Sequence, residues 1–144
     1  MVICADTSFL FSLYGNDANS AQALGWTAAN RLPLTVSIFN EYELGNALRF
    51  AEFRKGIAAG AAALYWAQFE ADRAAGRLAA QVCNLAEVLA EAQRISASRS
   101  LKGGHRSFDI LHVAAALQLK ATTFLTFDGN QKKLAKAEGL HVPI

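Results

Sequence analysis

Four acidic residues stand where the sequence could assemble a carboxylate site. Asp6 and Asp128 each follow a short apolar segment typical of a strand, whereas Glu43 and Asp109 lie early in apolar helical segments. In open α/β sheets, ligands gather beyond the carboxyl ends of the strands, and all four side chains could reach that edge. Grouped there, the carboxylates would repel and raise one another's pKa unless a cation lay between them. The pattern indicates a cation site.

The types of donor limit which cation this site would take. The acids offer only oxygen ligands, and no cluster of Cys or His accompanies them. Magnesium or manganese therefore suits the site better than zinc or copper. Because such ions activate water and stabilise charge on phosphate oxygens, the expected chemistry is phosphodiester cleavage.

Each acid also has a purely structural interpretation. Asp6 could cap the helix that it precedes, and Asp128 in Asp-Gly-Asn could form an ordinary turn. Asp109 could complement a helix N-terminus behind a Ser107 cap, and Glu43 could be solvated. We favour the cation site because it explains four acids at one edge together, whereas the alternative needs a separate reason for each.

Short apolar strands alternate with helices along the chain, which predicts an α/β fold with a parallel, doubly wound sheet. The expected strands cover residues 2–5, 34–37 and 123–127, with a weaker candidate at 79–83 and an edge strand at 140–144. The first expected helix begins at Asp6-Thr7-Ser8. The other expected helices cover residues 38–55, 57–75, 85–99, 108–120 and 131–138.

The composition fits one globular domain over residues 1–144. Of these 144 residues, 53% are hydrophobic and 18% are charged, enough for one core. No apolar run approaches the roughly 20 residues of a membrane span, and the first residues lack the pattern of a signal peptide, so a cytoplasmic protein is expected. Cys4 and Cys83 lie in apolar segments and are expected to be buried, reduced thiols.

Positive charge is concentrated in the second half of the chain. Residues 1–72 carry four basic and seven acidic groups, a balance of −3, whereas residues 73–144 carry ten and five, a balance of +5. A polyanion is therefore expected to contact the second half. Lys102, His105 and Arg106 flank a glycine pair there and could hold RNA phosphates, although a solvated loop is an equal alternative.

Four segments resemble the successive motifs of PIN domains, and in particular those of the VapC toxins of bacterial toxin–antitoxin pairs. The segments are Asp6-Thr7-Ser8, Glu43-Leu44-Gly45-Asn46, Arg106-Ser107-Phe108-Asp109-Ile110-Leu111-His112-Val113-Ala114 and Thr126-Phe127-Asp128. Their order and spacing extend over almost the whole chain. The resemblance implies a single PIN domain with a PIN-like three-layer α/β/α fold and a central, mostly parallel sheet.

The resemblance also implies a function, a magnesium-dependent ribonuclease, and assigns roles to the residues. Mg²⁺, or Mn²⁺, would be held mainly by Asp6, Asp109 and Asp128, with Glu43 in the same acidic cluster. The residues that would orient carboxylates or water are Thr7, Ser8, Asn46 and Thr126. An RNA substrate, a homodimer and a cognate VapB-like antitoxin are implied as partners. His112, a lone histidine among apolar neighbours, is expected to be a packed helix residue and not catalytic.

Two other functional classes compete with this interpretation. An Asp-phosphorylated receiver or phosphatase also has an Asp after its first strand. The phosphatase usually carries a second Asp two residues later, where this chain has Ser8, and the late lysine of the receiver cannot be placed. A non-catalytic RNA-binding module on the same fold is the other alternative, since fold does not fix function. Retention of all four acids disfavours it.

Overall fold

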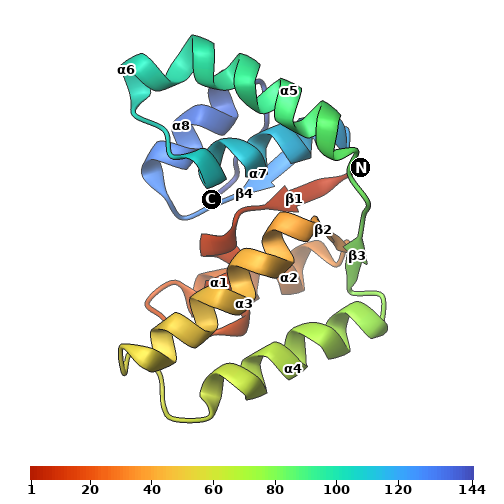
Figure 1. Ribbon diagram of the computed structural model, residues 1–144. Coiled ribbons are helices and arrows are strands. Elements are labelled where there is room, and N and C mark those ends of the chain that lie inside the picture. The colour runs from red at the N-terminus through yellow and green to blue at the C-terminus, as the bar shows by residue number, and fades with distance from the viewer.

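The computed structural model describes residues 1–144 and has a small sheet between two groups of helices (Figure 1). The sheet has four strands in the order β3-β2-β1-β4, and every neighbouring pair is parallel. The strands are β1 (Ile3–Ala5), β2 (Leu34–Val36), β3 (Leu78–Ala80) and β4 (Thr123–Leu125). At the centre, Cys4 of β1 pairs with Thr35 of β2 and Phe124 of β4. The predicted α/β fold with a parallel sheet is therefore confirmed.

The helices alternate with these strands, largely as the sequence predicts. Their bounds are α1 (Thr7–Tyr14), α2 (Ser20–Asn30), α3 (Ile38–Phe53), α4 (Ala61–Ala74), α5 (Leu85–Ile95), α6 (Leu101–Gly103), α7 (Ser107–Gln118) and α8 (Gly129–Ala137). Helices α1 to α4 lie on one side of the sheet and α5, α7 and α8 on the other (Figure 1). None of the helices combines the length and the apolar character that spanning a bilayer requires.

Two buried hydrophobic clusters join the helices to the sheet. The first contains Phe9, Leu44 and Phe69 from the side of α1 to α4, and the second contains Val113 and Leu134 from the side of α7 and α8. Successive side chains of a strand point to opposite faces, so in β1 Ile3 and Ala5 enter the first cluster while Cys4 enters the second. Burial on both faces explains why β1 is apolar throughout.

The structure corrects two predicted elements in the second half of the chain, the strand at 140–144 and the helix at 85–99. The expected edge strand at 140–144 is wrong: only an isolated bridge joins His141 to Thr123. Pro143 has no N–H to donate to a sheet, which explains why pairing stops there. The expected helix over 85–99 ends as α5 at Ile95 and continues as a π-helical turn, Ser96–Ser100. Cys4 and Cys83 are buried and free, as expected.

Candidate functional site

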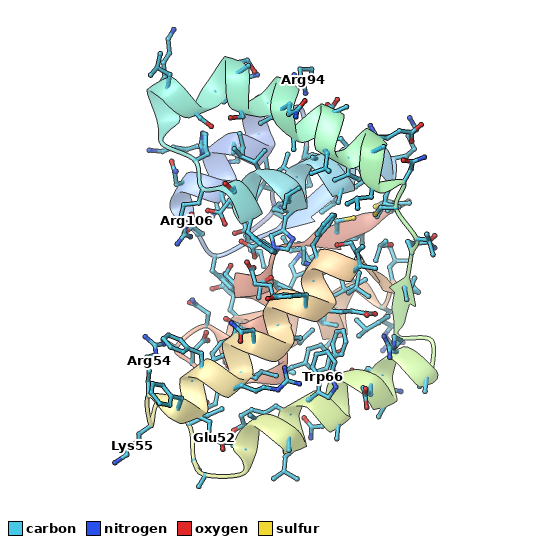
Figure 2. All side chains as sticks on the ribbon, viewed as in Figure 1. Glu52, Arg54, Lys55, Trp66, Arg94 and Arg106 are labelled. Atoms are coloured by element: carbon cyan, nitrogen blue, oxygen red, sulfur yellow. The ribbon has the colours of Figure 1, made fainter.

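All four acids singled out in the sequence line one cleft of about 820 Å³. Asp6 follows β1, Asp128 lies three residues after β4, Glu43 is in α3 and Asp109 is in the first turn of α7. Carboxyl ends of parallel strands open at one edge of the sheet, and the cleft lies there. Four phenylalanines and two arginines share its walls: Phe11, Phe50, Phe108, Phe127, Arg54 and Arg106. Arg54 and Arg106 extend from the same side of the molecule in Figure 2.

Asp6 is the most buried of the four acids, with 4% of its surface exposed. It caps α1, since its Oδ1 accepts from the backbone N–H of Phe9 at 3.0 Å and from Ser8 Oγ at 2.7 Å. Its Oδ2 accepts from the hydroxyl of Thr126, a fully buried residue. Burial raises the pKa of Asp6, against the three hydrogen bonds and the nearby His112, which lower it. Capping and a place in the cleft are thus compatible.

Hydroxyl groups also connect the end of β4 to the start of α1. Thr126 Oγ1 accepts from the backbone N–H of Asp128 at 3.0 Å, and Ser8 Oγ accepts from that of Phe127 at 3.2 Å. The same two side chains donate to Asp6. Ser8 and Thr126 therefore fix the Asp6 carboxylate relative to the backbone that carries Asp128.

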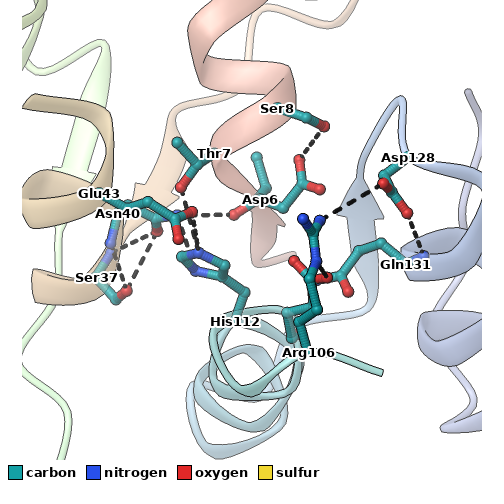
Figure 3. Close-up of polar contacts among 12 residues, drawn as sticks. Asp6, Thr7, Ser8, Ser37, Asn40, Glu43, Arg106, His112, Asp128 and Gln131 are labelled. Carbon is teal, nitrogen blue, oxygen red and sulfur yellow. Dashed lines mark hydrogen bonds and ion pairs between the residues drawn. The ribbon is translucent and has the colours of Figure 1, made fainter. Parts of the chain in front are cut away.

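Glu43 is held by an imidazole and a hydroxyl. His112 Nε2 lies 2.9 Å from Glu43 Oε1 and 3.2 Å from Thr7 Oγ1 (Figure 3). Burial acts to raise the pKa of Glu43, but hydrogen bonds from His112 and Thr7, with the positive charge of Arg106, outweigh it and lower that pKa. We call Asp6 and Glu43 the neutral-bonded pair, because uncharged groups supply most of their hydrogen bonds.

Asp109 and Asp128 share a positively charged partner, so we call them the arginine-bonded pair. Arg106 Nε donates to Asp109 Oδ2 at 3.0 Å, and its Nη2 lies 3.9 Å from Asp128 Oδ2 (Figure 3). Asp128 Oδ1 accepts from the backbone N–H of Gln131 at 2.8 Å and caps α8. The Arg106 side chain itself is 77% exposed. The hydrogen bond to Asp109 raises the pKa of Arg106.

Several other residues singled out in the sequence do not have the place or the role expected of them. Asn46 is an exposed residue of α3 that does not line the cleft. Lys102 and His105 also lie outside the cleft lining, and His105 Nδ1 is 3.2 Å from Asn130 Nδ2. Ser107 is not a cap: α7 begins after Arg106, with no side-chain cap at that position. Of the three basic candidates, only Arg106 reaches the cleft.

Two buried residues at this edge, Asn40 and Ser37, were not predicted from the sequence to have a role. They form a capping box at the start of α3, and Asn40 also reaches the carbonyl of Ala5 and the ring of His112. The spacing Ser-x-x-Asn before an apolar helix is a signal for the box. Nothing in the sequence signals the contact with His112, because α3 and α7 meet only in the folded chain.

The donors at this edge match a hard cation by type, although their present positions do not form a closed ligand set. The four acids offer carboxylate oxygens alone, the ligands that Mg²⁺ and Mn²⁺ prefer. No three His, Cys, Asp or Glu side chains come together as a metal-binding group. Arg106 lies between Asp109 and Asp128, so its guanidinium supplies positive charge there.

Comparison with known proteins agrees with this fold. A family model described as PIN domain matches residues 3–137. No curated protein sequence matches the chain.

Solved structures of similar fold cover nearly all of the chain. VapBC2 from Rickettsia felis, bound to a DNA fragment from their promoter, is 14% identical, with a TM-score of 0.68 over 99% of this chain and 97% of that chain. FitAcB from Neisseria gonorrhoeae is 18% identical, with a TM-score of 0.67 over 98% and 96%. PAE2754 from Pyrobaculum aerophilum is 21% identical, with a TM-score of 0.60 over 99% and 83%. At these identities the likeness shows the fold alone.

Proposed function

Because the chain belongs to the PIN domain family, we propose that it is a magnesium-dependent endoribonuclease whose catalytic acids are Asp6, Glu43, Asp109 and Asp128. One observation carries the proposal: side chains from four separate elements line the same cleft. Helix capping alone accounts for the places of Asp6 and Asp128, but it does not account for Glu43 and Asp109 in the same cleft. The whole of residues 1–144 would act as a single PIN domain.

In this proposal Asp6, Asp109 and Asp128 hold Mg²⁺, or Mn²⁺ in its place, and Glu43 completes the acidic cluster. The bound ion would activate water and stabilise charge on the phosphate oxygens of RNA. Ser8 and Thr126 orient the Asp6 carboxylate, and Thr7 orients that of Glu43. The lowered pKa of Glu43 keeps this carboxylate ionised near neutral pH, so it adds negative charge at the edge of the site.

The RNA would lie along the walls of the cleft. Arg106 and Arg54 line it and supply positive charge for phosphates, which the acids alone would repel. The phenylalanines of the same wall offer flat surfaces on which unpaired bases can stack. Lys102 and His105 lie outside the cleft lining and would contact RNA only on its approach.

We further propose that the chain is a VapC-like toxin, which forms a homodimer and binds a VapB-like antitoxin. The support is the likeness in fold to VapBC2 over nearly the whole length of both chains. A cognate antitoxin would occupy the cleft or displace the metal, since the cleft is the place where the acids are accessible.

Incubation of the purified chain with total RNA, with and without Mg²⁺, tests the proposed function. We expect cleavage by the parent protein in Mg²⁺ and none in chelator. Asp109→Asn should abolish cleavage, because it removes a ligand charge without changing the size of the side chain. Glu87→Gln, a matched change at an exposed acid of α5, should cleave as the parent does. Cleavage that persists in chelator, or in Asp109→Asn, would contradict the assignment.

A further inference from the structure

His112 joins three elements at the edge of the cleft although its side chain is almost fully buried, with 1% exposed. Its ring lies on α7, its Nε2 faces Glu43 and Thr7, and its Nδ1 lies 3.3 Å from Asn40 Nδ2 (Figure 3). A buried imidazole with polar contacts at both nitrogens has one proton to place when it is neutral. The position of that proton decides what the ring can do for Glu43.

The amide of Asn40 determines which nitrogen of His112 carries the proton, because the orientation of this amide is fixed by other groups. Asn40 Oδ1 accepts from the backbone N–H of Ser37 at 3.0 Å and from Ser37 Oγ at 3.2 Å. Asn40 Nδ2 donates to the carbonyl oxygen of Ala5, at the end of β1, at 3.0 Å. If the amide were flipped, Nδ2 would face the N–H donor of Ser37 and Oδ1 would face the carbonyl oxygen of Ala5. Neither contact could then be a hydrogen bond. The second hydrogen of Nδ2 is therefore free to point at His112.

A donor facing His112 Nδ1 requires that Nδ1 accept, so the ring proton resides on Nε2. From Nε2 it points at Glu43 Oε1, 2.9 Å away, which is the shorter of the two Nε2 contacts. Thr7 then lies beside the same carboxylate and adds its hydroxyl. Glu43 thus receives a hydrogen bond from a ring whose proton is placed by Asn40.

We infer that His112 is a positioning residue: Asn40 fixes its Nε2–H tautomer, and that tautomer holds the Glu43 carboxylate at the edge of the acidic cleft. The capping box of α3 and the orientation of one proposed catalytic acid are then parts of one hydrogen-bonded chain, from Ser37 through Asn40 and His112 to Glu43. The inference rests on the proposed function in one respect, that Glu43 belongs to the metal site. The tautomer itself does not depend on any activity.

The tautomer is tested by ¹H–¹⁵N correlation spectra of the imidazole rings in the metal-free protein. We expect His112 to show an unprotonated Nδ1 and a protonated Nε2, and His112→Gln assigns its signals against those of His105 and His141. Asn40→Asp replaces the donor by an acceptor of the same shape, so Nδ1 should gain a proton. Asn46→Asp, at an exposed position of the same helix, should leave Nδ1 unprotonated. A protonated Nδ1 in the parent, or no change in Asn40→Asp, would overturn the inference.

The positioning role is tested by the affinity for Mn²⁺, followed by electron paramagnetic resonance. His112→Leu removes the donor to Glu43, a member of the acidic cluster, and should weaken Mn²⁺ binding by roughly 10-fold, the smaller end of the losses that follow removal of partners behind metal ligands. His112→Gln can place an N–H where Nε2 was and should recover part of the affinity. His141→Leu, at an exposed histidine, controls for the change to leucine.

The outcomes separate this inference from the proposed function. Equal losses in His112→Leu and His112→Gln, with both proteins folded, would mean that the ring only fills space, which would overturn the positioning role. A parent protein that binds no Mn²⁺ would overturn the proposed function and the role at the metal. The spectra would still decide the tautomer in that case.

Discussion

The neutral-bonded pair, Asp6 and Glu43, and the arginine-bonded pair, Asp109 and Asp128, are held in different ways. Asp6 receives hydrogen bonds from Ser8, Thr126 and a backbone N–H, and Glu43 receives its own from a buried imidazole and a hydroxyl. Asp109 and Asp128 share one guanidinium whose side chain is 77% exposed.

The two kinds of hydrogen-bond partner leave different amounts of carboxylate charge available to a cation. Neutral donors fix the direction of a carboxylate but leave its charge available to a cation. A guanidinium cancels that charge, yet an exposed ion pair contributes only about 0–1 kcal/mol, so a cation can displace it at small cost. We therefore expect the neutral-bonded pair to be rigid before metal binds and the arginine-bonded pair to adjust when it does.

The largest expected effect is the loss of cleavage in Asp6→Asn. Asn caps a helix about as well as Asp, so α1 should stay intact while the ligand charge disappears. We expect RNA cleavage to fall to background with the far-ultraviolet circular dichroism spectrum unchanged. Wild-type turnover in this variant would remove Asp6 from the catalytic acids.

The next effect concerns the donors of the neutral-bonded pair. Thr126→Val removes a buried hydroxyl that donates to Asp6 and accepts from the backbone N–H of Asp128. Leaving such buried groups unsatisfied costs about 1–3 kcal/mol, so urea unfolding should show a loss of that size. Thr122→Val, at an exposed threonine, should change the free energy of unfolding by less than about 0.5 kcal/mol. Equal effects of the two substitutions would contradict a structural role for the Thr126 hydroxyl.

The two acids of the neutral-bonded pair should affect stability in opposite directions as pH changes. Burial raises the pKa of Asp6 in the folded protein, so the folded state binds this proton more tightly than the unfolded state does. Without metal, its contribution should favour folding less as pH rises from about 4, the usual pKa of Asp, through the raised value. The pKa of Glu43 is lowered, so its stabilisation is present above about 4 and is lost as pH falls through the lowered value.

Urea unfolding across this pH range in chelator measures both contributions. Subtracting the free energy of unfolding of Asp6→Asn from that of the parent should give a difference that falls with rising pH. The same subtraction for Glu43→Gln should give a difference that rises. Slopes of the same sign would mean that the two carboxylates do not differ in environment as the contacts indicate.

Arg106→Ala should have the smallest effect on stability and a distinct effect on ligands. We expect the free energy of unfolding to change by at most about 1 kcal/mol, because the side chain is exposed. Binding of uncleavable RNA should weaken, and the salt slope of log K should fall by roughly one unit if Arg106 contacts one phosphate. Mg²⁺ should bind more tightly than in the parent, since Asp109 and Asp128 lose their competing cation. An unchanged salt slope would place the RNA elsewhere.

The sequence predicted where the acids lie along the backbone better than it predicted which groups bind them. Asp6 and Asp128 could be located because each follows an apolar strand, and strand ends share one edge in a parallel sheet. Helix α2 was not predicted from the sequence. Ala23 is its only buried residue, so its apolar periodicity is weak.

The hydrogen-bond partners could not be predicted because they join segments far apart in the chain. His112 reaches Asn40 and Glu43 across about seventy residues, and the spacing of Arg106 to Asp109 equally fits an ordinary helix pair or a phosphate contact. Which partner each group takes depends on how α3 and α7 pack in the folded protein.

Calorimetric titration of Mg²⁺ into the parent and into Asp109→Asn tests most directly whether these acids hold a cation. We expect the parent to bind Mg²⁺ and Asp109→Asn to bind it at least about 10-fold more weakly, with a correspondingly smaller rise in melting temperature on adding Mg²⁺. Equal Mg²⁺ affinities in the two proteins, or no binding by the parent, would contradict a metal site at this cleft.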